Sequence, residues 1–361
     1  MATLTGGATA RRTAFHPLTV RAVERLTDDA AAVTFDLPDE LRAEFAFAAG
    51  QSLTLRRVLD GVEHRRTYSI CAPVGGPPRI GVREVPGGLF SSWLVHDVRP
   101  GDRVEVQAPS GAFRADPAAG GRHLCVAAGS GITPVLSIAA SLLRGSDARV
   151  TLLYGNRTAG SVMFADELAD LKDAYHDRLE LVHVLSREPR DVDLFSGRLD
   201  GARLRELLRR VVPVADVDHV WLCGPLGMID EARAALTEAG VPADRVHREL
   251  FWVDEPPPAL RRPDRVVEGE TSQVTVVLDG RATTSAVPRD ERLLDAAQRV
   301  RADLPFACRG GVCGTCRARV VEGEVDMVRN YALEPQEVAD GFVLTCQSYA
   351  AGDHVVVDYD A

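Results

Sequence analysis

Lysine is nearly absent from this sequence. Of 42 basic residues among 361, 41 are arginine and only Lys172 is lysine. The arginines are spread over the whole length, and 52 acidic residues give a formal net charge of −10. Nucleic acids and anionic membrane surfaces bind concentrated basic patches. We therefore expect no nucleic-acid partner and no membrane-surface partner.

Long apolar runs are also missing. No window approaches the roughly 18 uninterrupted apolar residues that indicate a transmembrane helix, and residues 1–12 lack the apolar core of a signal peptide. We therefore expect a cytoplasmic protein. The nine histidines are scattered without metal-ligand spacing. The sequence contains no general-acid or nucleophile constellation, so we expect no catalytic side chain of that kind.

The length is typical of two or three domains, and two stretches rich in turn residues divide the chain. One covers residues 115–121, and the other is centred on the triplet Pro256–Pro258, which is extended and suits an interdomain spacer. These stretches predict a first domain at 1–116, a second at 117–253, a spacer at 254–270 and a third domain at 271–361.

Each segment has its own pattern. The first reads as short strands with a hairpin turn at Asp60-Gly61 and few helices, which predicts an antiparallel barrel. The second alternates strands and helices, which predicts a parallel sheet with crossover helices. The third opens with a hairpin around Asp279-Gly280 and continues with one main helix near Leu293–Val300, so we expect a small β-rich domain.

Four of the seven cysteines lie near the end of the chain. Cys308, Cys313 and Cys316 are spaced C-x4-C-x2-C, and 29 residues separate Cys316 from Cys346. Plant-type ferredoxins use this spacing to ligate a [2Fe–2S] cluster. A structural zinc site is the alternative, but zinc ribbons usually bring two C-x2-C pairs and here there is one. A disulfide pair is a third interpretation.

A glycine-rich turn follows the predicted strand at 123–128 and precedes a predicted helix. Glycines allow close backbone approach to a pyrophosphate, and a helix N-terminus offers N–H donors to it. Proline is tolerated in the first helical turn. An ordinary tight turn is the alternative. The candidate nucleotide-binding residues of this turn are Gly129, Gly131, Thr133 and Pro134.

Two arginines follow the next two predicted strands. Arg157 comes after Tyr154-Gly155-Asn156, and Arg187 comes after Ser186. Both lie at carboxyl ends of parallel strands, where ligands bind in open α/β sheets. Neither strand end carries the lone acid that reads a ribose 2′-hydroxyl, so the sequence favours NADPH over NADH. Solvated surface arginines are the alternative interpretation.

Two motifs of the first segment suit a flavin. Arg66 can pair with a phosphate, Tyr68 can stack on a ring, and Ser69 can hydrogen-bond a ring heteroatom. About twenty residues later, Gly87–Ser92 offers small and hydroxyl residues for a second phosphate at a helix start. Ordinary strand and turn residues are the alternative. The candidate residues of both motifs are Arg66, Tyr68, Ser69, Ile70, Gly88, Phe90, Ser91 and Ser92.

Together these motifs resemble the ferredoxin–NADP reductase superfamily over nearly the whole chain. Residues 65–71, 154–158 and 304–308 carry the resemblance at the superfamily level. Residues 330–335 (Asn-Tyr-Ala-Leu-Glu-Pro) and 344–347 are more particular to one group, the reductase components of phenylacetyl-CoA epoxidases, to which the chain is similar.

The resemblance implies three domains: an antiparallel Greek-key β-barrel for FAD, an α/β parallel-sheet nucleotide-binding domain, and a β-grasp ferredoxin-like domain. It places the nicotinamide near residues matching Thr133 and Cys223-Gly224-Pro225. It also places an acid and an aromatic residue near the flavin, for which Glu249 and Phe251 are the local candidates.

The same resemblance implies electron flow from NADPH to FAD, then to the [2Fe–2S] cluster and on to an oxygenase component. That partner would be a di-iron phenylacetyl-CoA epoxidase. The alternatives are the reductase of another aromatic-ring oxygenase or di-iron monooxygenase and, in another class, a non-catalytic redox sensor.

Overall fold

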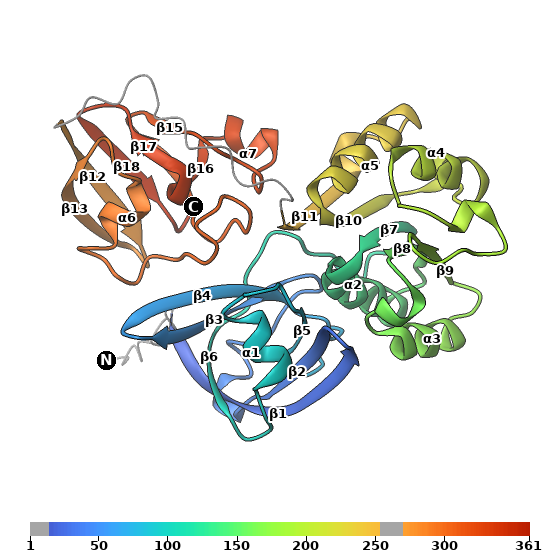
Figure 1. Cartoon of the computed structure of the whole chain (residues 1–361). Helices are drawn as coiled ribbons and strands as arrows, with labels where there is room; N and C mark the ends of the chain where they lie inside the picture. Colours follow the sequence, from blue (N-terminus) through green and yellow to red (C-terminus); the bar gives the residue numbers. More distant parts are fainter. Residues whose placement is uncertain (1–13, 253–269) are drawn as a thin grey trace, which may run out of the picture.

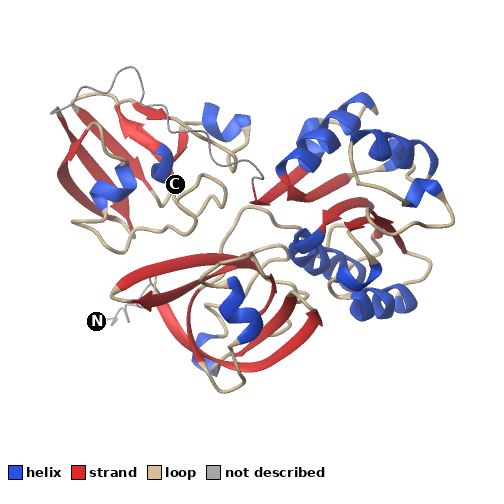
Figure 2. Ribbon diagram, in the orientation of Figure 1, coloured by secondary structure: helices blue, strands red, loops and turns tan. Residues whose placement is uncertain are grey.

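The computed structural model describes residues 14–252 and 270–361. They form three lobes: a barrel, an α/β lobe and a sheet-rich C-terminal lobe (Figure 1). Strands dominate the first and third lobes, whereas helices flank the sheet of the middle one (Figure 2). The predicted spacer at 254–270 lies outside the described residues except for Glu270, and the predicted boundary at 116/117 stays a prediction.

The first lobe is a six-stranded antiparallel sheet in the order β4-β3-β6-β1-β2-β5. A bridge between Ile70 and Ile80 joins the end of β4 to β5, so the sheet closes into the predicted barrel. Asp60 and Gly61 have φ of 50° and 76°, as a two-residue hairpin turn requires. The elements are β1 (Phe15–Thr27), β2 (Ala30–Asp36), β3 (Ser52–Leu59), β4 (Val62–Ser69), β5 (Arg79–Arg83), α1 (Ser91–His96) and β6 (Arg103–Gln107).

The second lobe is a five-stranded parallel sheet in the order β11-β10-β7-β8-β9. The alternation of strands and helices is confirmed. Helix α4 and the edge strand β11 were not predicted. The elements are β7 (Arg122–Ala128), α2 (Ile132–Gly145), β8 (Arg149–Asn156), α3 (Ala165–Ala174), β9 (Leu179–Leu185), α4 (Gly201–Arg210), β10 (His219–Pro225), α5 (Leu226–Glu238) and β11 (Val246–Trp252).

Helix α2 joins the first two lobes into one packed body. Twelve of its fourteen residues are buried, and they share a hydrophobic core with Ala49 and Phe113 of the barrel. The Ser137 hydroxyl donates to the carbonyl of Ala72 at 2.7 Å. Because close-packed interiors resist deformation, the start of α2 has a fixed position relative to the barrel.

The third lobe contains a five-stranded sheet in the order β13-β12-β18-β14-β16, in which β12 and β18 are parallel. Asp279 and Gly280 have φ of 53° and 67°, as expected for the predicted hairpin. The predicted main helix ends earlier, at Ala297, and a second short helix is present. The elements are β12 (Thr271–Leu278), β13 (Arg281–Pro288), α6 (Leu293–Ala297), β14 (Arg317–Glu322), β15 (Val325–Met327), α7 (Pro335–Ala339), β16 (Phe342–Leu344), β17 (Ser348–Ala350) and β18 (His354–Asp358).

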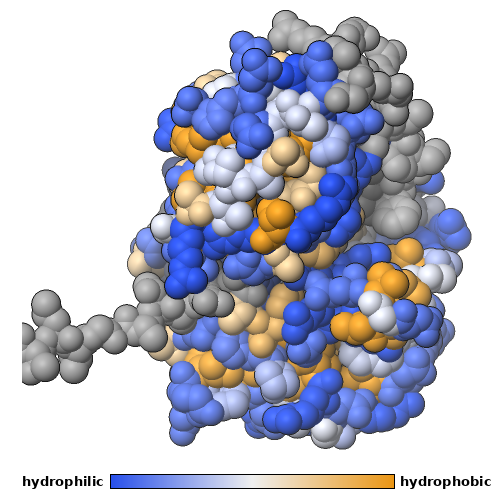
Figure 3. Space-filling view, turned by 90° about the vertical axis from the view of Figure 1, so that its left-hand side faces the viewer, coloured by the Kyte–Doolittle hydropathy of each residue, from blue (hydrophilic) through white to orange (hydrophobic). Residues whose placement is uncertain are grey.

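Among the described residues, the exposed large hydrophobic side chains are spread over all three lobes. Within the two described ranges, no helix is long and apolar enough to cross a membrane. On the face drawn in Figure 3, hydrophobic residues form small groups among hydrophilic ones.

Candidate functional site

A cavity of about 570 Å³ lies where the three lobes meet. Its walls come from the end of β4, the segment before α1, the start of α2, the end of β11 and the cysteine loop. Segments that lie far apart in the sequence therefore face the same space. The predicted site residues that line it are Arg66, Tyr68, Ser69, Gly88, Phe90, Ser91, Thr133, Glu249, Phe251, Cys308 and Cys313.

The other predicted residues lie outside this lining. Ile70 belongs to the barrel core, and Ser92 hydrogen-bonds Glu84. Cys316 and Cys346 are buried. The remaining residues belong to the adjoining carboxyl edge of the parallel sheet and are Gly129, Gly131, Pro134, Arg157, Ser186, Arg187, Cys223, Gly224 and Pro225.

The barrel wall of the cavity suits a flavin. Burial raises the pKa of Tyr68, so its phenol stays neutral. The Arg66 side chain is exposed and forms no ion pair within the described ranges, which leaves it available for a phosphate. At Gly88 a Cβ would lie 2.4 Å from the Ser91 Oγ, so this wall has no room for a larger residue. An aromatic face, a free cation and a tight glycine turn fit FAD.

Glu249 is the acidic group of the cavity. It lies in the middle of β11 and accepts a hydrogen bond from the Ser69 Oγ at 3.1 Å. Burial raises the pKa of Glu249 to about 8. The carboxyl is therefore mostly protonated at neutral pH and can hold or donate a proton inside the cavity.

The raised pKa of Glu249 predicts that the stability of the folded protein depends on pH. Unfolded Glu249 ionises near 4.5 and the folded group only near 8. Since the unfolded state releases its proton first, the stability contributed by the protonated group should fall from about pH 5 to about pH 8 and level off above that. In thermal melts, the melting temperature of the wild type should decline over this window relative to Glu249→Gln. Parallel pH profiles would contradict the shift.

The glycine-rich turn lies between strand β7 and helix α2, in the strand–turn–helix order that the sequence predicts. Gly129 has a φ of 53°, and its carbonyl accepts a hydrogen bond from the Tyr154 hydroxyl at 3.0 Å. Gly131 packs against the end of β10, where an added Cβ would lie 2.1 Å from the Cys223 carbonyl oxygen. Close backbone approach at the N-terminus of α2 fits a pyrophosphate.

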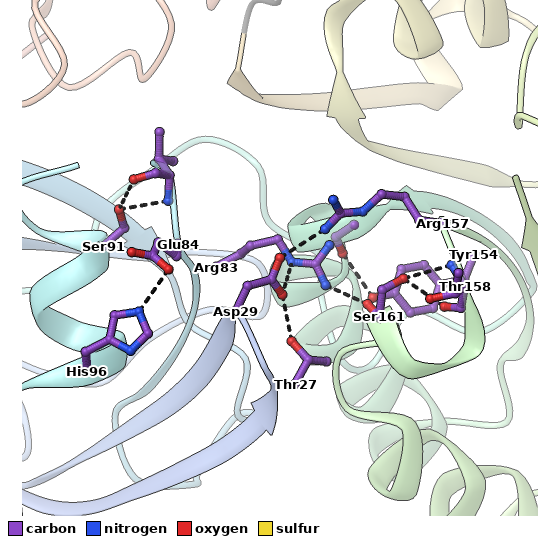
Figure 4. A network of polar contacts seen from close by, with 12 residues as sticks. Thr27, Asp29, Arg83, Glu84, Ser91, His96, Tyr154, Arg157, Thr158 and Ser161 are labelled. Carbon is purple, nitrogen blue, oxygen red and sulfur yellow. Dashed lines mark hydrogen bonds and ion pairs between the residues drawn. The ribbon is translucent and has the colours of Figure 1, made fainter. Parts of the chain in front are cut away.

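An ion-pair network links this region to the barrel (Figure 4). The Asp29 carboxylate lies 3.0 Å from Arg157 and 3.5 Å from Arg83. Burial alone would raise the pKa of Asp29, but the Thr27 hydrogen bond and the two guanidinium charges lower it below its ordinary value. Arg157 therefore already has an anionic partner, whereas Arg187 is exposed and makes no ion pair in the described part of the chain.

Sequence reasoning missed Arg83. Its guanidinium lines the cavity, donates to the Ser161 carbonyl at 2.6 Å and approaches Gly129. A basic residue at the end of strand β5, shortly before the double glycine, was the available signal. Its position between the cavity and the nucleotide turn follows from the packing of α2 on the barrel.

The four cysteines form two thiol pairs. Hydrogen bonds from Cys313 and from Cys316 lower the pKa of Cys308 and of Cys346, respectively. Within 14–252 and 270–361, no three His, Cys, Asp or Glu side chains gather around a point that would suit one metal ion. Two separate pairs fit a two-iron cluster better than a tetrahedral zinc site.

The loop backbone also fits a cluster. The Gly310 N–H donates to the Cys308 sulfur at 3.3 Å, and the Gln347 amide lies 3.5 Å from the Cys346 sulfur. Arg309, Gly311 and Gly314 all have positive φ, which bends the loop around the thiols. Such N–H groups tune the potential of a sulfur-ligated cluster.

Three family models match the chain. They describe an oxidoreductase FAD-binding domain at residues 17–115, an oxidoreductase NAD-binding domain at 125–234 and a 2Fe-2S iron-sulfur cluster binding domain at 276–351. With the geometry above, they define a reductase that binds FAD, a nicotinamide nucleotide and a [2Fe–2S] cluster and transfers electrons between them.

Relatives match nearly the whole length of the chain. A 1,2-phenylacetyl-CoA epoxidase subunit from Escherichia coli K12 is 44% identical over 97% of this chain and 99% of its own. The ferredoxin reductase component of 3-ketosteroid-9-alpha-monooxygenase from Rhodococcus rhodochrous is 33% identical over 95% and 96%. The solved phthalate dioxygenase reductase, 25% identical, covers 95% of this chain and 98% of its own with a TM-score of 0.59. The chain belongs to the ferredoxin–NADP reductase superfamily, in the group with a C-terminal ferredoxin domain.

Proposed function

We propose that this reductase takes electrons from NADPH and delivers them to a di-iron epoxidase that acts on phenylacetyl-CoA. One observation carries the electron path: Cys308 and Cys313 line the same cavity as Tyr68 and Ser69. The 44% identity to a phenylacetyl-CoA epoxidase component over nearly the full length supports the choice of partner. A cytoplasmic location is part of the proposal, because none of the seven cysteines forms a disulfide, which is typical of a protein in a reducing compartment.

In this proposal, each wall of the cavity binds a different cofactor or part of one. When bound, FAD would supply the chemistry that links a two-electron hydride donor to a one-electron acceptor such as the cluster. Arg66 and the Gly88–Ser92 turn hold its phosphates, and Tyr68 and Ser69 orient its ring. Thr133 and the Cys223–Pro225 segment hold the nicotinamide beside it, with the nucleotide phosphates at Gly129–Gly131. The four cysteines hold the cluster.

The domain division follows the same assignment. We propose that 1–116 is the flavin domain, 117–253 the nucleotide domain and 271–361 the ferredoxin-like domain. The matched family models fall inside these limits.

The partner can be tested by reconstitution. The purified reductase, mixed with the purified epoxidase component from the same organism, should couple NADPH oxidation to the consumption of phenylacetyl-CoA. The same epoxidase without reductase is the control. Normal flavin and cluster reduction without substrate turnover would contradict the epoxidase partner and favour another oxygenase, while leaving the reductase chemistry intact.

The preference for NADPH can be tested at Arg187. Because this arginine is free to meet a 2′-phosphate, Arg187→Ala should raise the KM for NADPH by about tenfold, the effect of losing one charge-assisted contact, and leave the KM for NADH unchanged. Steady-state ferricyanide reduction with both nucleotides measures this. Equal effects on both nucleotides would remove Arg187 from the phosphate site.

A further inference from the structure

The ferredoxin-like lobe is attached to both other lobes by side chains on the two sides of its cysteine loop. One attachment involves Arg65 of the barrel, and the other involves Glu334 of the segment 330–335. The proposed flavin and nucleotide sites use neither residue. Both are candidates for holding the cysteine loop against the cavity.

Arg65 is the first attachment. Only 5% of this residue is exposed, and its guanidinium lies 4.1 Å from the centre of the Phe306 ring. It also approaches the carbonyl of Leu304, at 3.4 Å. Desolvated cation–π contacts are stronger than exposed ones. Because Phe306 precedes Cys308 by two residues, this contact fixes the start of the cysteine loop.

Glu334 is the second attachment. Its Oε1 lies 2.7 Å from the Nε of Arg248 on β11, whose side chain is only 12% exposed, and its Oε2 lies 4.0 Å from Arg233. Nearby, Tyr331 and Val312 pack against the hydrophobic core of the nucleotide lobe. A part-buried charge pair beside an apolar contact holds position better than an exposed pair.

The attached residues adjoin the groups that line the cavity. Arg248 precedes Glu249, and Val312 precedes Cys313. A shift of the loop at either attachment would therefore change the gap between the cysteines and the opposite wall. The rate of electron transfer depends steeply on that gap. The protein's contribution to cofactor chemistry is to set this distance and the orientation of the cofactors.

We propose that Glu334 and Arg65 are positioning residues that hold the cysteine loop at the cavity and thereby set the rate at which the cluster is reduced. The proposal rests on the proposed flavin site in that cavity. Neither residue takes part in the earlier reduction of flavin by nicotinamide. The segment 330–335, which carries Glu334 and from which Tyr331 reaches the cavity wall, is the anchor on the nucleotide side.

A charge reversal on full-length holoprotein tests this role. In Glu334→Lys, anaerobic stopped-flow should show cluster reduction slowed by about tenfold, equivalent to about 1.4 kcal/mol. Flavin reduction by NADPH and ferricyanide turnover should be unchanged. The double variant Glu334→Lys/Arg248→Glu should regain most of the rate. Glu238→Lys, which breaks the exposed pair with Arg205, is the matched control and should behave as wild type.

Hydrogen exchange supplies a readout that does not depend on turnover. Amides of 304–315 and 328–337 should exchange faster in Glu334→Lys and return towards wild type in the double variant. If Glu334→Lys assembles poorly, shown by its cluster content, Arg65→Met decides, with the same slowing expected. Cluster reduction at the wild-type rate in the assembled variant, or no rescue by the swap, would overturn the proposal. A wild type without flavin-dependent ferricyanide reduction would instead contradict the flavin site.

Discussion

Cys313→Ser should lower the rate of cytochrome c reduction by NADPH by about 100-fold or more, while reduction of ferricyanide persists. Cys313 pairs with Cys308 at the cavity wall, and iron–sulfur clusters are held by cysteine thiolates, so a serine in its place should cost the cluster. The flavin alone can serve ferricyanide. Iron and sulfide content, together with both activities, measures the result.

Cys71→Ser is the matched control. Cys71 is buried in the core and its thiol donates to the Arg79 carbonyl at 3.3 Å, a bond that a serine hydroxyl can keep. This variant should retain the cluster and both activities. Loss of ferricyanide reduction in Cys313→Ser would show that the cluster holds the fold together and would remove this evidence for its place in the electron path.

Gly131→Ala should lower kcat/KM for NADPH by about 100-fold. The added methyl carbon would lie 2.1 Å from the Cys223 carbonyl oxygen and 2.9 Å from the Gly224 nitrogen. Both are backbone atoms, so the α2 start must move away from the end of β10, and overpacking of this kind costs about 1–3 kcal/mol. Steady-state kinetics with NADPH give the loss, and flavin reduction by dithionite should stay normal.

Gly227→Ala controls for the substitution itself. Gly227 lies on α5 just after the same segment, and an added Cβ would meet nothing within 4 Å. Its kinetics should match the wild type. A kcat/KM within about threefold of wild type for Gly131→Ala would mean that this close approach does not shape the nicotinamide site.

Local chemistry explains what could be predicted from the sequence. The cysteine spacing, the two Asp-Gly turns and the glycine turn before α2 depend on neighbouring residues, and the structure has each of them. The expected helix start at Ser91 and Ser92 is confirmed, because helix α1 begins at Ser91. Its extent could not be predicted, because a six-residue helix owes its stability to packing, here of Leu94 into the barrel. Strand β11 was missed because charged residues interrupt its apolar pattern.

Local sequence patterns could not predict which residues meet in the cavity. Ser69 meets Glu249 across 180 positions of sequence, and their contact depends on how α2 packs on the barrel. The same packing gives Arg157 a partner in Asp29, so an arginine that suited a phosphate by sequence already has an anion beside it. The contact of Glu334 with Arg248 likewise depends on the placement of the third lobe.

The order of electron transfer is the central claim, and rapid-scan absorbance after anaerobic mixing with NADPH tests it most directly. Flavin absorbance should bleach first, and cluster absorbance should follow at a rate independent of NADPH concentration. A cluster that stays oxidised while the flavin is fully reduced, or a flavin that NADPH does not bleach, would contradict the account.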